Sequence, residues 1–207
     1  MDETIYSRRK FIKTLSIGVG SLLLLPRCTF SKASDWRFFT NEEGALVDAI
    51  VEQIIPTDEW PGAKYAMVTN FIDKQLVGPY TRHQEIYRNS LSAIQIACKK
   101  AFSKKFEELA WDEQTDFLVS LEKNEIATKV LDKSVANGNP IRDADKAIIE
   151  NWLKSNFFSL IRNHTMQGFY GSPRHGGNYK FVSYRMIGLY PYPIMGQNRY
   201  KASSNGQ

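Results

Sequence analysis

The sequence predicts a mainly α-helical protein: a single helical domain that ends in an irregular segment rich in aromatic residues and glycine. Three observations support this prediction. Apolar residues recur every three or four positions through much of residues 40–161, which is the period of an amphipathic helix. Capping patterns precede these stretches, and proline or glycine follows several of them. From Gly168 onward the periodicity stops, and no part of the chain alternates long enough to indicate a strand.

The first predicted helix begins with a capping box, in which Thr40 is the N-cap and Glu43 is the third helical residue. Pro56 ends this helix. Residues 57–62 have the composition of a loop, and a second helix is expected over about residues 63–76. The apolar positions of the first helix are Leu46, Val47, Ile50, Val51 and Ile54.

Three further helices are expected. A capping-box pattern opens a long helix over about residues 81–106, and a short helix starts at Trp111. The stretch 123–141 is polar and contains a strong loop signal, so we expect it to connect helices. Asp143 then caps a last long helix over residues 143–161. The loop signal is Asn137-Gly138-Asn139-Pro140.

The N-terminal residues have the pattern of an export signal. A basic region precedes an apolar run of eleven residues, from Leu15 to Leu25. The paired arginines followed by Phe-Ile-Lys look like a twin-arginine (Tat) signal, which is an address read by the Tat translocase. A membrane-spanning helix needs about 20 apolar residues, so an anchoring helix is the less favoured alternative. The signal residues are Ser7, Arg8, Arg9, Phe11, Ile12 and Lys13.

The length and the charge of the chain after this signal indicate a single domain. Without residues 1–28 the chain has 179 residues, which is enough for one domain with its own core. Residues 29–39 are expected to be a linker, residues 40–200 the helical domain, and residues 201–207 a polar tail. The formal charge of +5 falls to +2 without the signal, and no basic run indicates binding to nucleic acid.

The body of the chain lacks the motifs of a cofactor site. Its histidines have no metal-ligand spacing, and there is no dinucleotide, nucleophile-elbow or c-type haem motif. Cys98 has apolar neighbours and is expected to be a small buried hydrophobe. Cys28 is a candidate for lipidation, although Pro26 and Arg27 fit such a site poorly. A folded-cargo signal without a cofactor site indicates a chain that escorts a cofactor-bearing partner.

Two loops and the C-terminal aromatic residues are candidate sites, each with a structural alternative. Asp58 and Glu59 form either a catalytic carboxylate pair or a loop cap. Residues 175–178 form either a tight turn or a loop that inserts into a partner. The aromatic residues bury against either the chain's own helices or a partner protein. The partner-binding candidates are Phe169, Tyr170, Gly176, Gly177, Asn178, Tyr179, Tyr184 and Met186.

Motifs at both ends of the domain are similar to those of a known family. The first runs from Ile54 to Ala63 and continues with Val68 and Phe71-Ile72-Asp73. The second is Gly168-Phe169-Tyr170-Gly171-Ser172-Pro173, followed by Gly176-Gly177-Asn178, and the third is Tyr184-Arg185-Met186-Ile187-Gly188-Leu189-Tyr190-Pro191. Their order resembles the gluconate 2-dehydrogenase subunit 3 family over about residues 40–195, with Tyr184 in place of the more usual tryptophan.

The resemblance implies a small, non-catalytic subunit of a periplasmic sugar or sugar-acid dehydrogenase. In that family the catalytic subunit is a separate GMC-type flavoprotein that carries FAD, and a c-type cytochrome often receives the electrons. The flavoprotein lacks an export signal and leaves the cytoplasm with the small subunit. We therefore expect no cofactor or catalytic residue in this chain, and any membrane association to come through the complex or through Cys28. The alternatives are a free-standing periplasmic binding module or lipoprotein, and a small enzyme that acts alone.

Overall fold

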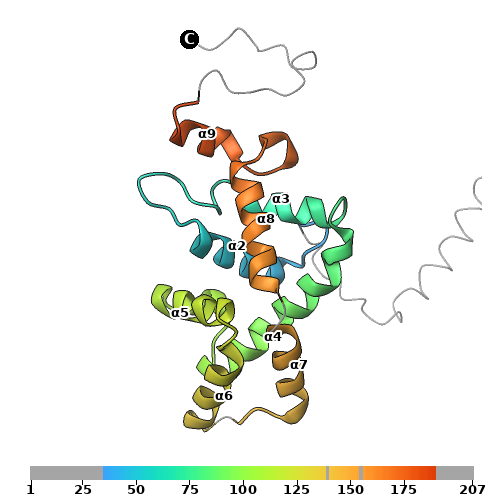
Figure 1. The fold of residues 1–207 in the computed structure, drawn as a ribbon, viewed down its shortest axis with the longest axis vertical. Helices are drawn as coiled ribbons and strands as arrows, with labels where there is room; N and C mark the ends of the chain where they lie inside the picture. The colour runs from blue at the N-terminus through green and yellow to red at the C-terminus, as the bar shows by residue number, and fades with distance from the viewer. Residues whose placement is uncertain (1–34, 139, 154–155, 190–207) are drawn as a thin grey trace, which may run out of the picture. The chain divides into compact units, whose positions relative to one another are not determined.

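The computed structural model describes residues 35–138, 140–153 and 156–189, and the fold is given for these residues only. They form helices and turns without any strand, which confirms the prediction of a mainly α fold (Figure 1). No helix in this part of the chain is long and apolar enough to cross a membrane. The α-helices are α2 (Asn41–Ile54), α3 (Val68–Leu76), α4 (Gln84–Phe102), α5 (Trp111–Glu122), α6 (Ile126–Ala136), α7 (Asp143–Leu153), α8 (Phe157–Tyr170) and α9 (Val182–Met186).

The predicted capping box at the start of α2 is present. Thr40 Oγ1 accepts a hydrogen bond from the Glu43 N–H at 3.1 Å, and the Glu43 carboxylate accepts one from the Thr40 N–H at 2.8 Å. These bonds satisfy backbone donors that a helix start leaves unpaired. The helix ends at Ile54, shortly before Pro56, as expected. Its buried residues include Leu46, Val47, Ile50 and Val51.

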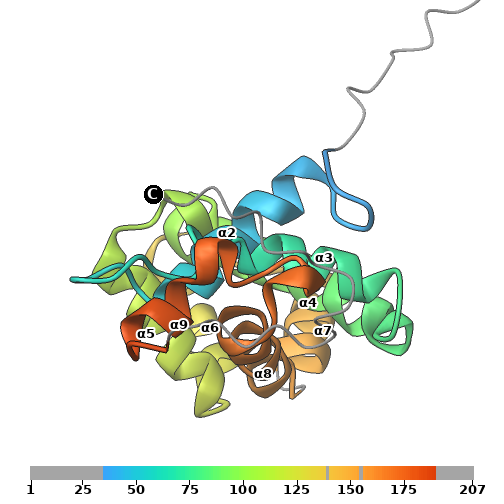
Figure 2. The same ribbon diagram turned by 90° about the horizontal axis from the view of Figure 1, so that it is seen from above.

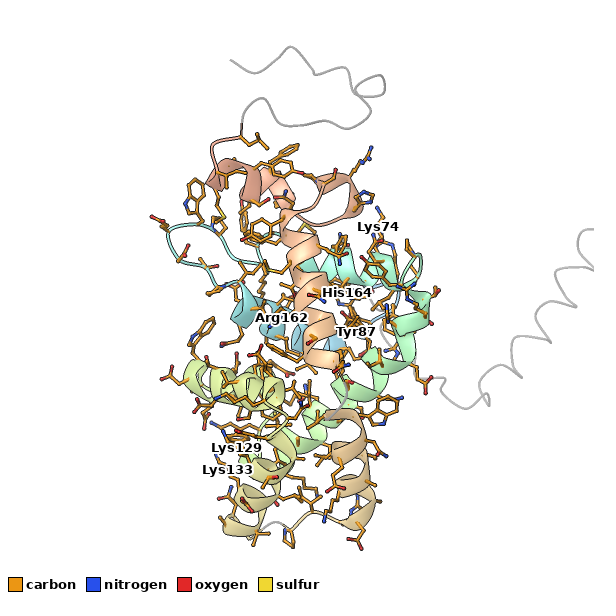
Figure 3. The ribbon with its side chains drawn as sticks, viewed as in Figure 1. Lys74, Tyr87, Lys129, Lys133, Arg162 and His164 are labelled. Carbon is orange, nitrogen blue, oxygen red and sulfur yellow. The ribbon has the colours of Figure 1, made fainter. Side chains whose placement is uncertain are left out.

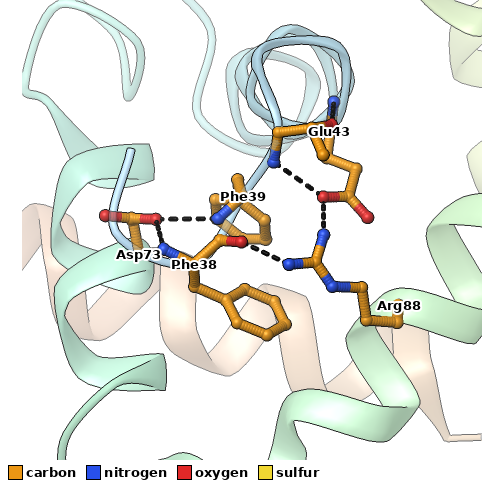
Figure 4. A network of polar contacts seen from close by, with 6 residues as sticks. Phe38, Phe39, Glu43, Asp73 and Arg88 are labelled. Carbon is orange, nitrogen blue, oxygen red and sulfur yellow. Dashed lines mark hydrogen bonds and ion pairs between the residues drawn. The ribbon is translucent and has the colours of Figure 1, made fainter. Parts of the chain in front are cut away.

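The segment before α2 packs against the domain, although the sequence analysis placed it in a linker. The buried carboxylate of Asp73 on α3 accepts three backbone N–H groups, from Arg37 at 2.9 Å, Phe38 at 2.8 Å and Phe39 at 3.0 Å (Figure 4). Phe39 itself is buried in the core. A buried carboxylate is stable only with such partners, so Asp73 fixes this segment against α3.

Arg88 on α4 holds the same segment from the other side. Its guanidinium donates to the carbonyl oxygen of Phe38 and to the carboxylate of Glu43 (Figure 4). The guanidinium also lies over the Phe38 ring, 4.1 Å from the centroid. The start of α2, the segment before it and α4 are thereby joined in one polar network.

The second helix begins later than predicted. α3 starts at Val68 rather than near residue 63, and residues 64–67 form turns. Met67 has a φ of 59°, and this left-handed conformation does not occur inside a right-handed helix. The apolar periodicity is real from Val68 onward, and it contains no signal of the break at Met67.

The long helix predicted over residues 81–106 is also shorter. A 3₁₀ turn at Thr81–His83 precedes α4. The predicted capping box is absent, because the Gln84 side chain donates to the Leu76 carbonyl oxygen at 2.8 Å. Ser103, with a φ of 57°, ends α4, and a second 3₁₀ turn follows at Phe106–Glu108. The buried residues of α4 include Tyr87, Ile94, Ala97 and Ala101.

The polar stretch 123–141, expected to be a connection, contains the helix α6. This helix buries Ile126, Ala127, Val130 and Ser134, leaves Leu131 partly exposed and exposes Val135. The helical spacing of Ile126, Ala127, Val130 and Leu131 is present in the sequence, but the charged residues around it and the loop signal after it favoured a connection. The turn at Asn137-Gly138 is confirmed, while Asn139 lies outside the described residues.

The last long helix is divided in two. α7 begins at Asp143, as predicted, and ends at Leu153, whereas α8 begins at Phe157 and extends beyond residue 161 to Tyr170. Beyond α8 the described chain has only short helical segments, which are the 3₁₀ turns Pro173–His175 and Tyr179–Phe181 and the five-residue helix α9. Within the described residues, the segment after α8 is thus irregular apart from these brief helical turns.

α4 links two groups of helices in the domain. α2, α3 and α8 pack against one another, and α9 packs on α8 (Figure 1). α6 and α7 pack against α4 at the opposite end from α9. Figure 2 views the domain from the α9 end, where the segment after α8 turns back over its neighbours. This end presents both of the predicted loops.

Two buried rings join α4 to α8 in the core (Figure 3). Tyr87 Oη and His164 Nδ1 share a hydrogen bond of 2.9 Å. The ring of Tyr80 stacks on His164, with the centroids 4.3 Å apart. Burial, together with the nearby positive charges of His83 and Arg82, lowers the pKa of His164 to about 4. His164 is therefore a neutral core residue near pH 7.

Candidate functional site

The loop between α2 and α3 is built around the carboxylate of Glu52. One oxygen accepts the N–H of Thr57 at 3.0 Å and its hydroxyl at 2.7 Å, and the other accepts the Lys64 N–H at 2.9 Å. Gly62 fits tightly inside, because an added Cβ would lie 2.6 Å from the Thr57 nitrogen. The loop is thus fixed by its own hydrogen bonds, and the sequence analysis did not identify Glu52 as their centre.

Asp58 and Glu59 lie at the exposed side of this loop. The Asp58 carboxylate accepts the N–H of Trp60 at 2.8 Å, and the Asp58 N–H donates to the Trp60 carbonyl oxygen at 3.0 Å. These bonds are those of a residue that caps a tight turn. The geometry favours the loop-cap interpretation over a catalytic carboxylate pair.

The C-terminal segment follows a path that requires glycine. Gly176 has a φ of 104°, which side chains rarely adopt. An added Cβ at Gly177 would lie only 2.2 Å from the carbonyl oxygen of Gly168 on α8, so the two backbones are in direct contact. The buried side chain of Asn178 then donates to the Gly171 carbonyl oxygen at 2.9 Å and accepts the Ser183 N–H at 3.0 Å.

The two predicted loops meet, although they are more than 100 residues apart in the sequence. The Tyr179 N–H donates to the Ala66 carbonyl oxygen at 3.1 Å. The rings of Tyr65 and Tyr179 are 5.9 Å apart. The Asn70 amide on α3 donates to the Gly176 carbonyl oxygen at 2.7 Å. Residues 56–67 and 170–189 therefore form one surface at the α9 end of the domain (Figures 1 and 2).

The predicted partner-binding residues divide into buried and exposed groups. Phe169, Gly177 and Asn178 are buried in the chain itself, so they shape the segment and cannot contact a partner directly. Gly176 is partly buried in the turn, and the Tyr184 hydroxyl donates to Gly171 at 3.4 Å. Tyr170, Tyr179 and Met186 remain exposed. Four exposed apolar residues that the sequence analysis missed accompany them, namely Tyr65, Met67, Ile187 and Leu189.

We call these seven exposed side chains the apolar face. Tyr65, Tyr170 and Tyr179 are each more than 40% exposed, and Ile187 is 70% exposed. Tyr65 and Tyr179 contact each other, and the other five lie on the same two segments. Exposed apolar groups on adjoining segments are typical of a protein contact surface. Their spacing in the sequence has no helical period, so only the fold reveals that Tyr65 and Tyr179 are neighbours.

The remaining chemistry of the described residues is structural. Cys98 is buried, as expected, and burial raises the pKa of its thiol far above the usual range. No group of three or more His, Cys, Asp or Glu residues within the described ranges could hold a metal ion. A cleft between α4, α5 and α6 contains Lys129 and Lys133 (Figure 3). Lys129 donates to Ser120 at 2.7 Å, and Lys133 lies over the Phe102 ring, so both lysines serve the fold.

The export-signal residues, Ser7, Arg8, Arg9, Phe11, Ile12 and Lys13, and the candidate lipidation site Cys28 lie outside the described residues. Their roles therefore stay predictions.

The chain matches one protein family. The family model for gluconate 2-dehydrogenase subunit 3 matches residues 41–191, which include the loop after α2 and the whole described part of the C-terminal segment. No curated protein and no solved structure gives a match. The matched region thus contains both loops that form the apolar face.

Proposed function

Because this chain belongs to the gluconate 2-dehydrogenase subunit 3 family, we propose that it is the non-catalytic small subunit of a periplasmic FAD-dependent sugar or sugar-acid dehydrogenase. Membership of the family implies association with the catalytic subunit of a dehydrogenase. In our proposal that subunit is a GMC-type flavoprotein, FAD belongs to it, and a c-type cytochrome accepts its electrons. This chain contributes binding and export.

The apolar face is the observation that carries the proposal. Its tyrosines are exposed, yet the backbone beneath them is fixed by the Glu52 loop and by the packing of Gly177 on α8. A fixed surface loses little conformational freedom when a partner binds, so its apolar area contributes to affinity with a low ordering cost. Tyrosine and methionine are also enriched in protein interfaces. A subunit that works by docking needs such a surface and no reactive group.

The proposed route of export is the Tat pathway. The flavoprotein would fold around FAD in the cytoplasm, bind this chain, and cross the membrane with it under the address carried by Arg8 and Arg9. In the periplasm the flavoprotein would stay bound to this chain. Lipidation of Cys28 would add a membrane anchor to the complex.

Co-export of the flavoprotein tests this proposal. The chain is expressed with the GMC-type flavoprotein of the same genome, and periplasmic flavin and dehydrogenase activity are measured. In the Arg8→Lys/Arg9→Lys variant both proteins should be lost from the periplasm, because the charge is kept but the recognised pair is removed. Lys10→Arg, beside the pair, is the matched control and should leave export unchanged.

Three results would overturn the proposal. Export of the flavoprotein in the absence of this chain would show that it does not depend on the escort. Dehydrogenase or hydrolase activity of the purified chain without its partner would favour a small enzyme acting alone. A purified chain that binds no flavoprotein would favour a free-standing binding module or lipoprotein.

A further inference from the structure

Charge is divided unequally along this chain. Residues 151–207 contain seven lysines and arginines and no acidic residue, whereas residues 35–150 contain 14 basic and 20 acidic residues. The last acidic residue of the whole sequence is Glu150. The C-terminal part, which contributes most of the apolar face, is therefore uniformly cationic.

The structure places three of these cations on the segment that carries most of the apolar face. Arg174, Lys180 and Arg185 are exposed and alternate along the chain with the exposed apolar residues of the same segment. The Lys180 ammonium lies 5.3 Å from the centroid of the Tyr179 ring. Lys74 on α3 extends to the same turn and donates to the Arg174 carbonyl oxygen at 3.3 Å (Figure 3). The apolar face thus has a basic border.

The loop that carries Tyr65 has one more acidic than basic residue, because Asp58 and Glu59 outnumber the exposed Lys64. Asp58 and Glu59 are exposed next to the tight turn at Trp60, and the bonds from Glu52 and within the turn hold the loop in place. The loop is joined to the cationic segment by the contact of Tyr65 with Tyr179. One surface therefore has an apolar centre, a basic side and a small acidic side in fixed positions.

We infer that this surface docks on an acidic patch of the flavoprotein, with an apolar centre facing Tyr65 and Tyr179 and a separate basic group facing the Asp58-Glu59 loop. The inference rests on the proposed function and names the chemistry that the partner must present. Complementary potentials raise the rate of association and exclude wrong partners and wrong orientations. Because the two charged sides differ in sign, only one orientation satisfies both.

A protein fits this surface better than a membrane does. Basic and aromatic residues together also bind anionic lipid headgroups. A bilayer surface is uniformly anionic, however, and would repel the exposed Asp58 and Glu59 that stand beside the apolar face. A folded partner can present opposite charges to the two sides, so the bipolar pattern favours a protein.

Charge reversal tests the inference. The mature chain is immobilised, and the association rate of the purified flavoprotein is measured at low salt and at about 0.5 M salt, where the Debye length is only several ångströms. Lys180→Glu/Arg185→Glu should slow association about tenfold at low salt, and the difference should shrink at high salt. Glu59→Lys should also slow association. Circular dichroism checks that each variant is folded.

The matched control carries the same change in net charge at other sites. Lys123→Glu/Lys146→Glu alters exposed lysines at the turn after α5 and on α7, away from the apolar face. It should slow association by less than twofold. Equal slowing by the control and the face variant would overturn the inference and leave only an effect of net charge.

Binding to lipid vesicles and binding of the unaltered chain to the flavoprotein are also measured. Binding to vesicles of anionic phosphatidylglycerol that Glu59→Lys strengthens, together with unchanged flavoprotein binding, would assign the face to a membrane and overturn the inference. Tight flavoprotein binding that no face variant alters would overturn it while keeping the proposed function. Failure of the unaltered chain to bind the flavoprotein would overturn both.

Discussion

Two carboxylates fix the segments on either side of α2. The Asp73 carboxylate gathers three backbone N–H groups before α2, and the Glu52 carboxylate organises the loop after it. Both residues belong to amphipathic helices. From the sequence, an acidic residue in such a helix is expected to face solvent. Their partners are loop amides, and the sequence pattern carries no information about where those amides fold.

His164 makes stability depend on pH in a defined direction. Burial lowers its pKa to about 4 from the usual 6.5, so between these values the unfolded chain binds a proton that the folded chain does not. Stability should therefore fall as the pH decreases from about 6.5 to about 4, by up to about 1 kcal/mol per pH unit, and this contribution should level off below pH 4.

Chemical denaturation across this pH range checks the prediction. His164→Gln removes the titrating ring and should flatten the decline, although it also removes the partner of Tyr87 and lowers stability overall. His175→Gln, at an exposed histidine, is the matched control. A decline of equal slope in the parent chain and in His164→Gln would contradict this account of the buried ring.

At the scale of elements, the close contact between Gly177 and α8 determines where the C-terminal segment lies. Gly177→Ala would place a Cβ 2.2 Å from the Gly168 carbonyl oxygen, and neither backbone atom can move alone. The substitution should cost about 1–3 kcal/mol and detach residues 171–189 from α3 and α8 while the other helices remain folded. Limited proteolysis should then cut this segment, with little loss of helical circular dichroism.

Gly78→Ala provides the comparison for this variant. Its added Cβ would meet no atom closer than 3.5 Å, which is an ordinary contact distance. It should leave the proteolytic pattern unchanged. If Gly177→Ala is as resistant to protease as Gly78→Ala, the segment is held by something other than this contact.

The helices show what the sequence pattern can and cannot predict. α2 was predictable from Thr40 to Pro56, because its cap, its apolar period and its stop agree. α6 was missed although Ile126, Ala127, Val130 and Leu131 have helical spacing, because the charged residues around them and the loop signal that follows gave the stretch the composition of a connection. The break at Met67 depends on a backbone conformation that the loop imposes, and no residue type at that position signals it.

At the scale of the whole molecule, the candidate site could be predicted only in part. The C-terminal candidates Tyr170, Tyr179 and Met186 are exposed. Phe169 is internal because it lies on the buried side of α8, and Asn178 is internal because the turn at Gly176 and Gly177 folds it against the end of α8. Tyr65 joins the apolar face through a contact between distant parts of the sequence. The absence of acidic residues after Glu150 is a signal that the sequence alone contains, and it marks the same surface.

The most direct test of the account is hydrogen exchange on the mature chain, measured alone and bound to the flavoprotein. We expect a stable complex in which the backbone amides of residues 56–67 and 170–189 become protected, while α6 and α7 exchange as they do in the free chain. The amides of Asp58, Trp60 and Tyr179 report on both sides of the apolar face. Protection confined to α5, α6 or α7, with none on the apolar face, would contradict the account, as would the absence of a complex.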